Sequence, residues 1–162
     1  MKPIQITVIA VGKIKEKYLR EGIAEYEKRL VPLVKLKILE IPEARHPAHI
    51  TPAKEASAKE EEGSRILAAI PAESHAVALD VTGEGWSSMD LAGAIDRWEL
   101  AGRNRLAFII GGDLGLSAEV LSHCQMRLSL SPMTFTHQMA RMIFLEQLYR
   151  AFRIKRGEPY HK

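Results

Sequence analysis

Residues 128–162 read LSLSPMTFTHQMARMIFLEQLYRAFRIKRGEPYHK. The stretch predicts a short apolar strand, a turn at Pro132, a helix over residues 137–153 and a tail that ends in Tyr160-His161-Lys162. Chain ends are usually frayed and chemically plain. An aromatic ring, an imidazole and a cation on the last three residues therefore indicate a tail with a function.

The rest of the chain repeats the alternation of strand and helix. Apolar runs predict strands over residues 4–11, 34–41, 76–81, 106–110 and 127–130. Helices are expected over residues 13–30, 53–70, 88–101 and 117–123, with a loop at 82–85. Thr51, Ser88 and Ser117 are expected as helix caps. The alternation predicts one α/β domain over residues 1–162, with a mostly parallel sheet and helices on both faces.

Composition narrows the class of protein. With 162 residues, 46% of them hydrophobic, the chain is long enough for one hydrophobic core that needs no disulfide or structural metal to stabilise it. The single Cys124 cannot form an internal disulfide, and no Cys/His cluster has metal-ligand spacing, so we expect a cytoplasmic protein without a metal. No apolar run approaches the roughly 20 residues of a membrane span, so no membrane association is expected.

Positive charge is concentrated near the tail. The net charge is only +3, but seven of the 23 Lys and Arg residues lie from Arg127 onward, opposed only by Glu146 and Glu158. A polyanionic partner fits this distribution. An ordinary solvated surface with chance clustering fits it equally well, so charge alone leaves both interpretations open.

The most promising ligand site follows the fourth and fifth strands. Ligands of open parallel sheets bind beyond the carboxyl ends of the strands, where this chain has a Gly111-Gly112 turn and the segment 130–135. The turn is either a tight structural turn or a binding loop. Backbone groups of the segment could hold an adenine, with Leu130, Met133 and Phe135 covering its faces. A nicotinamide-binding loop is a weaker interpretation, because the glycine spacing is wrong and no acid follows about twenty residues on.

The last helix has no clean polar side. At 100° per residue, one side carries His137, Arg141, Phe144, Leu148 and Phe152, and the other carries Met139, Ile143, Glu146, Arg150 and Arg153. A helix that is apolar nearly all round is buried nearly all round, so we expect a homodimer that packs against it. His137 and Arg141 either touch one ligand, or Arg141 pairs with a carboxylate while His137 caps the helix. Glu146 and Arg150 are expected to pair.

Three motifs occur in order along the chain: IIGGDLGLS, LSLSPMTFTHQMARMIFLEQLYRAFRI and GEPYHK. With the segments ITVIAVGKIK and AVALDVTGEGWSS, they make the whole chain resemble the bacterial large-subunit ribosomal RNA methyltransferase H family. The resemblance implies a SPOUT methyltransferase with a C-terminal trefoil knot, a homodimer and bound S-adenosylmethionine. It also implies methylation of N3 of a pseudouridine in 23S rRNA. The sequence leaves open whether the substrate is free rRNA, a subunit or the assembled ribosome, and we expect the assembled ribosome.

The resemblance also implies the site residues. The cofactor pocket would comprise Leu79, Gly111, Gly112, Leu130, Ser131, Pro132, Met133, Thr134 and Phe135. The matching helix and tail positions are His137, Arg141, Glu146, Gln147, Arg150, Tyr160, His161 and Lys162. The chain departs from relatives at Thr136, often proline, and at Asp113, often proline or a small residue; these departures affect only the detailed shape of the loops.

The expected reaction is an in-line displacement that needs alignment and loss of the N3 proton. His161 is the candidate base, Arg141 and Lys162 would stabilise the developing negative charge, and Tyr160 would stack on the target base. His137 and Arg150 are expected to bind substrate as well. In the alternative, the tail only grips RNA backbone. A non-catalytic ribosome-binding module is the main rival function, and cofactor binding distinguishes the two.

Overall fold

The computed structural model describes residues 3–162. The strands are β1 (Gln5–Val11), β2 (Lys35–Ile41), β3 (His75–Gly85), β4 (Arg105–Ile110) and β5 (Met126–Ser129). The helices are α1 (Lys17–Leu30), α2 (Pro52–Ala69), α3 (Ser88–Leu100), α4 (Ala118–His123) and α5 (His137–Lys155). Every strand and helix that the sequence predicted is present, with shifted ends.

The five strands form one sheet in the order β2-β1-β4-β3-β5, and every neighbouring pair is parallel. The predicted α/β fold with a parallel sheet is therefore confirmed. Parallel pairing brings the carboxyl ends of all five strands to one edge of the sheet. The trefoil knot stays a prediction with which this strand order is consistent.

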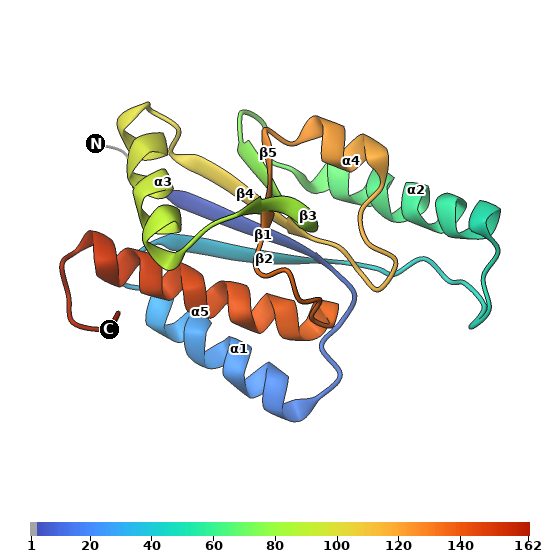
Figure 1. The fold of residues 1–162 in the computed structure, drawn as a ribbon, viewed down its shortest axis with the longest axis horizontal. Helices are drawn as coiled ribbons and strands as arrows, with labels where there is room; N and C mark the ends of the chain where they lie inside the picture. The colour runs from blue at the N-terminus through green and yellow to red at the C-terminus, as the bar shows by residue number, and fades with distance from the viewer. Residues whose placement is uncertain (1–2) are drawn as a thin grey trace.

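The helices cover both faces of the sheet, as predicted. Figure 1 shows α1, α3 and α5 on one side of the strands and α2 and α4 on the other. A hydrophobic core lies on each face of the sheet. Alternate residues of the central strand β4 pack in the two cores, because successive side chains point to opposite faces. Phe108 packs in the larger core with Phe144 of α5, whereas Ile109 packs in the smaller core with Ile66 of α2.

The predicted loop at residues 82–85 is wrong, because β3 continues through it to Gly85. The pairing of β3 with β5 shifts register between Leu79 and Glu84, the mark of a bulge. Gly83 permits this arrangement: a Cβ there would lie 2.7 Å from the backbone carbon of Arg127. Leu79, where the shift begins, pairs with Ile110 at the end of β4.

Helix starts follow the expected capping chemistry with two changes. The side chains of Thr51 and Ser117 cap α2 and α4 as predicted. At α3 the cap is Ser87 rather than Ser88, because Ser87 and Asp90 form a reciprocal capping box. At α5 the Thr136 hydroxyl accepts from the Met139 amide, so His137 does not cap the helix.

The last helix, α5, lies over the sheet between α1 and α3 (Figure 1). Its sheet-facing side chains Phe144, Leu148 and Phe152 are buried, as the helical spacing predicted. The opposite side, with Met139 and Ile143, is half-buried, and no residue of α5 is fully exposed. The homodimer that would cover this side stays a prediction.

Candidate cofactor pocket and C-terminal tail

A cavity of about 800 Å³ lies at the carboxyl ends of β4 and β5, beside residues 79–81 of β3. Its walls come from four segments that are far apart in the sequence: the first turn of α1, the middle of β3, the turn after β4, and the segment after β5 together with the first turn of α5. Eight of the nine predicted cofactor residues line it: Leu79, Gly111, Gly112, Leu130, Ser131, Met133, Thr134 and Phe135. Pro132 is not among the lining residues. The volume is that of a small-molecule site.

The glycine turn lines the cavity because it packs tightly on the protein behind it. A Cβ on Gly111 would lie 3.0 Å from the Gly115 carbonyl carbon, and one on Gly112 would lie 3.1 Å from Val11 Cγ1. Gly115 adopts a φ of +83°, a conformation that favours glycine. The missing side chains therefore bring the backbone close to β1, so the turn is both a tight structural turn and a cavity wall.

A buried carboxyl group lies behind this turn. Glu62 of α2 is 2% exposed, and its Oε2 accepts a hydrogen bond of 2.9 Å from the Ala44 amide. Its Oε1 has no partner within residues 3–162 and lies 3.7 Å from the position of a Cβ on Gly112. Burial, opposed by the Ala44 hydrogen bond, raises the pKa of Glu62. Glu62 thus ties the segment after β2 to the cavity wall.

The segment after β5 forms the outer wall. The Ser129 hydroxyl donates to the Ser131 carbonyl at 3.0 Å, and the Ser131 hydroxyl accepts from the Met133 amide at 3.0 Å. These local bonds fix the backbone while Met133 remains 77% exposed and Phe135 is also exposed. Apolar side chains left in water at a cavity mouth are available to cover a ligand.

The lining residues that the sequence missed include Glu16, Tyr18, Val81 and Gln138. Tyr18 is 61% exposed at the cavity, in the first turn of α1. α1 begins at Lys17, four residues later than predicted, so Tyr18 lies at the start of the helix and not inside it. The charged residues Lys15, Glu16 and Lys17 directly before Tyr18 would have been a signal of an exposed position.

The C-terminal tail folds back against α5. After Gly157, whose φ is +67°, the Tyr160 hydroxyl donates to Glu146 Oε1 at 3.1 Å, and its ring packs edge-on against Tyr149. Arg150 pairs with Glu146, as predicted, and its guanidinium carbon lies 4.7 Å from the centre of the Tyr160 ring. The predicted substrate groups Arg150 and Tyr160 are therefore together. Lys162 is exposed.

Two observations limit the chemistry of the tail. Burial, with the neighbouring Glu146 carboxylate, raises the pKa of Tyr160 to about 12, so its hydroxyl remains a donor at neutral pH. Arg150 Nη1 lies 3.2 Å from His161 Nδ1. Because a guanidinium has only donors, Nδ1 must accept, which places the ring proton of His161 on Nε2.

The tail and the cavity lie at opposite ends of α5. Gln138 lines the cavity, whereas Arg150 holds the tail, and twelve residues of helix span roughly 18 Å. Figure 1 likewise shows the C-terminus beyond the far end of α5. The structure therefore does not bring His161 to the cavity of its own chain.

Arg141 lies neither among the residues that line the cavity nor in the C-terminal tail. Its side chain is 3% exposed, donates to Glu40 Oε2 at 2.6 Å and to the Gly12 carbonyl at 2.9 Å, and is thereby withdrawn from any ligand of the cavity. The carboxylate pair considered above for Arg141 is the arrangement found. His137 does line the cavity, with Nε2 3.5 Å from Glu43 Oε1. The two residues therefore do not share a ligand.

Comparison with known proteins gives concordant results. Residues 4–161 match the family model described as "Predicted SPOUT methyltransferase". The chain is 58% identical over 159 residues to the putative ribosomal RNA large subunit methyltransferase H of Methanoregula boonei, covering 98% of this chain and 100% of the relative. The corresponding protein of Carboxydothermus hydrogenoformans is 50% identical with the same coverage.

Solved structures agree at the level of the fold. A putative methylase family protein from Neisseria gonorrhoeae superposes with a TM-score of 0.54 at 15% identity, over 99% of this chain and 86% of that one. The tRNA (m1G37) methyltransferase from Aquifex aeolicus gives a TM-score of 0.52 at 15% identity, over 99% and 75%. Within residues 3–162, none of the helices combines the length and apolar character that a membrane span requires.

Proposed function

Because the chain belongs to the SPOUT methyltransferase family, we propose that it transfers a methyl group from S-adenosylmethionine to N3 of a pseudouridine in 23S rRNA. The ribosome is the proposed substrate, and the cytoplasm the proposed compartment. One observation carries the proposal: residues expected to hold the cofactor converge on one cavity of about 800 Å³. The names of the full-length relatives support rRNA as the substrate class.

The cavity fits the chemistry of the cofactor. Leu79, Leu130 and Phe135 offer apolar surfaces to an adenine, and the Gly111-Gly112 turn offers backbone groups to its polar edge. Bound S-adenosylmethionine supplies an already activated methyl group, so the protein needs chiefly to align the acceptor. No metal is part of this proposal.

The tail supplies the groups that face the substrate base. Tyr160 stacks on or borders the base, and Lys162 stabilises negative charge as the N3 proton leaves. His161 can donate from Nε2 to a carbonyl oxygen of the base in the arrangement found. It can act as the base only after Arg150 releases Nδ1, so we assign it first to binding and orientation.

A pH profile of single-turnover methyl transfer separates these roles of His161. If His161 only binds, His161→Ala lowers the rate by a constant factor at every pH, because the N3 proton leaves without it. A loss confined to one limb of the profile would instead assign His161 as the general base. His161→Gln is the matched variant, because its amide retains a donor.

We further propose that the active site is composite. A tail roughly 18 Å along α5 from the cavity of its own chain requires a second copy to complete the site. A homodimer that packs on the half-buried side of α5 would place the tail of one protomer near the cavity of its partner. The positive charge around the tail would then meet the RNA beside the bound cofactor.

Mixing two inactive variants tests the composite site. Ala140→Phe fills the cavity, and deletion of residues 160–162 removes the tail. Co-expressed with different tags, the two variants should recover roughly a quarter of wild-type activity, because half of random dimers are mixed and each holds one intact site. Tagged mixed dimers without activity would refute the composite site.

Substrate identity is tested by incubating the protein and labelled S-adenosylmethionine with 70S ribosomes, 50S subunits, naked 23S rRNA and tRNA. We expect transfer to ribosomal particles and recovery of one 3-methylpseudouridine after nuclease digestion of 23S rRNA. Transfer only to tRNA would contradict the proposed substrate. Ribosome binding without cofactor binding would favour the non-catalytic RNA-binding module.

A further inference from the structure

We propose that residues 13–18, which we call the lysine-tyrosine rim, bind the rRNA strand at the mouth of the cavity. In this proposal Tyr18 stacks on a nucleobase, and Lys13, Lys15 and Lys17 contact phosphate groups. The inference rests on the proposed function and adds a substrate-binding surface to it.

Tyr18 lies exposed at the cavity, close to buried residues of the same segment. Its neighbours Ile14 and Leu19 are buried in the core that α1 shares with the sheet, so they fix the two ends of the rim. Between them, residues 15–18 are exposed, and Tyr18 lines the cavity with 61% of its surface open to water. An aromatic ring in this position offers a free face to a base that approaches the cavity.

The rim is held in shape before any ligand arrives. Arg20 Nη1 donates to the carbonyls of Lys15 at 2.7 Å and Ile14 at 3.3 Å. The Lys15 amide donates to Gln138 Oε1 at 3.0 Å, which ties the rim to the first turn of α5. These bonds fix the backbone and leave the lysine ammonium groups free to reach outward, so little ordering is needed for binding.

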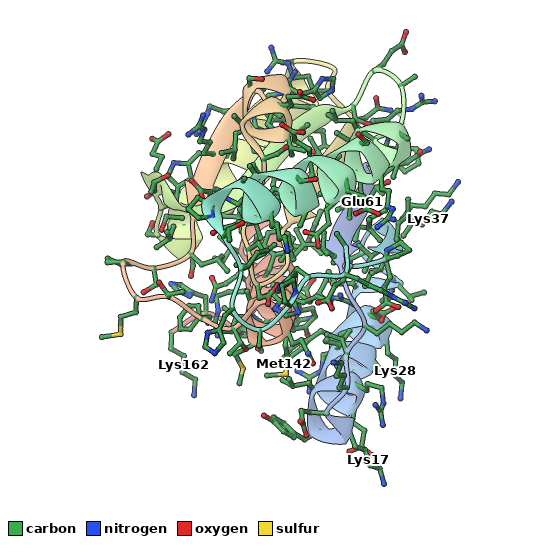
Figure 2. The ribbon with its side chains drawn as sticks, turned by 90° about the vertical axis from the view of Figure 1, so that its right-hand side faces the viewer. Lys17, Lys28, Lys37, Glu61, Met142 and Lys162 are labelled. Carbon is green, nitrogen blue, oxygen red and sulfur yellow. The ribbon has the colours of Figure 1, made fainter. Side chains whose placement is uncertain are left out.

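The charge of the rim favours RNA over a protein or lipid partner. Lys13 and Lys15 make no ion pair within residues 3–162, and Lys17 meets only Glu21, at 3.8 Å on an exposed surface. Figure 2 shows Lys17 pointing into solvent from the free end of α1. Three lysines followed by one exposed ring match the backbone and a base of a single strand. Glu16 is the one acid within the rim.

The rim also lies at the correct end of the molecule. Tyr18, Gln138 and Phe135 border the same cavity, so a base stacked on Tyr18 would lie beside the cofactor. The tail of the same chain is at the other end of α5 (Figure 1). Rim and tail would therefore grip the RNA from two protomers, one on each side of the target nucleotide.

The test compares Tyr18→Ala with Tyr18→Phe. We expect Tyr18→Ala to weaken ribosome binding and raise the KM for ribosomes roughly five- to hundred-fold, the range expected when one base–aromatic stack is removed, while Tyr18→Phe changes them little. Affinity for S-adenosylmethionine, measured by calorimetry, should stay unchanged. Unchanged ribosome affinity would overturn the proposal. A loss of cofactor affinity in Tyr18→Ala would also overturn it, by assigning Tyr18 to the cofactor site.

Charge is tested separately by replacing Lys13, Lys15 and Lys17 together with glutamine. The salt dependence of ribosome binding should fall by up to about 2 in log–log slope, at roughly 0.7 for each phosphate that a lysine no longer neutralises. Lys28→Gln with Lys37→Gln is the control, because both lysines are exposed and neither lines the cavity. An equal slope in the rim variant and the wild type would refute the binding of phosphate by these lysines.

Failure of the proposed function would look different from failure of this inference. A wild-type chain that binds ribosomes but transfers no methyl group would refute the proposed reaction, and the binding comparison would still decide the role of the rim. Normal transfer by the wild type with normal ribosome binding by Tyr18→Ala would refute the rim alone.

Discussion

The ion pair between Arg141 and Glu40 should respond asymmetrically to mutation. Arg141 is 3% exposed, whereas Glu40 is 43% exposed. Glu40→Ala leaves a buried guanidinium with only the Gly12 carbonyl as a partner. Removing one partner of a buried pair costs about 3–5 kcal/mol. Because water can enter from the exposed side of Glu40, we expect a loss of roughly 2–4 kcal/mol in unfolding free energy.

Arg141→Met should cost less. The freed Glu40 carboxylate can rehydrate, and the variant removes the buried Nε of Arg141, which has no partner within the described residues. The remaining cost arises because the Gly12 carbonyl loses its hydrogen-bond donor, which costs about 1–3 kcal/mol. Removal of the unpaired Nε partly offsets this cost. We expect a net loss of roughly 1–2 kcal/mol, and a similar loss for the double variant, since no buried charge remains.

Urea unfolding at pH 7 measures these differences. For a domain of this size, 1 kcal/mol corresponds to about 2–4 °C in Tm, so thermal unfolding provides a second readout. A larger loss for Arg141→Met than for Glu40→Ala, or additive single losses in the double variant, would refute the reasoning. Cofactor affinity of folded Arg141→Met should change little. A stable Arg141→Met that binds cofactor normally but has little turnover would show that Arg141 touches the substrate.

Three further predictions concern stability and reactivity. The pKa of Glu62 is raised by burial, so its stabilising neutral form persists below pH 4.5 and is lost as the pH rises through the folded-state pKa. Glu62→Gln should therefore have the same unfolding free energy as the wild type in acid and exceed it by up to about 1 kcal/mol at pH 7, as measured by urea unfolding. A large loss of unfolding free energy at pH 7 would mean that the charge of Glu62 stabilises the fold. A Cβ added at Gly93 in α3 would meet only Arg97 Nη1, at 3.4 Å, so Gly93→Ala should stabilise the protein by roughly 0.5–1 kcal/mol. A Cβ added at Gly63 would lie 2.6 Å from Ser117 Oγ, so Gly63→Ala should destabilise it. A higher Tm for Gly63→Ala than for Gly93→Ala would contradict this packing. Burial raises the pKa of Cys124 to about 11, so iodoacetamide should modify it at pH 8 roughly a hundred times more slowly than a free cysteine, and a rate equal to that of glutathione would contradict its burial.

Much of the fold follows from local chemistry in the sequence. Short apolar runs separated by amphipathic segments were sufficient for the strands and helices, and Thr51 and Ser117 act locally as caps. The extension of β3 through Gly83 was not predictable, because it depends on close approach to β5. Neither was the late start of α1, since it depends on the bond that Arg20 donates to the Lys15 carbonyl and on the bond that the Lys15 amide donates to Gln138.

Part of the candidate site could be located from the sequence, and part of it could not. The Gly111-Gly112 turn and the segment 130–135 could be located, because both directly follow strands of a parallel sheet. The burial of Arg141 could not, because Glu40 and Gly12 lie more than a hundred residues away in the sequence. Tyr18 was missed because its exposure depends on the boundary of α1. Contacts between distant segments thus decide which polar residues remain free for function.

Calorimetric titration of S-adenosylmethionine into the protein tests the central claim most directly. The wild-type chain should bind one cofactor per protomer, and Ala140→Phe, which fills the cavity, should abolish binding while remaining folded. Ala56→Phe, at an exposed position of α2, and deletion of residues 160–162 should bind as the wild type does. Absence of binding to the wild type, or undiminished binding to Ala140→Phe, would contradict the assignment of this cavity as the cofactor site.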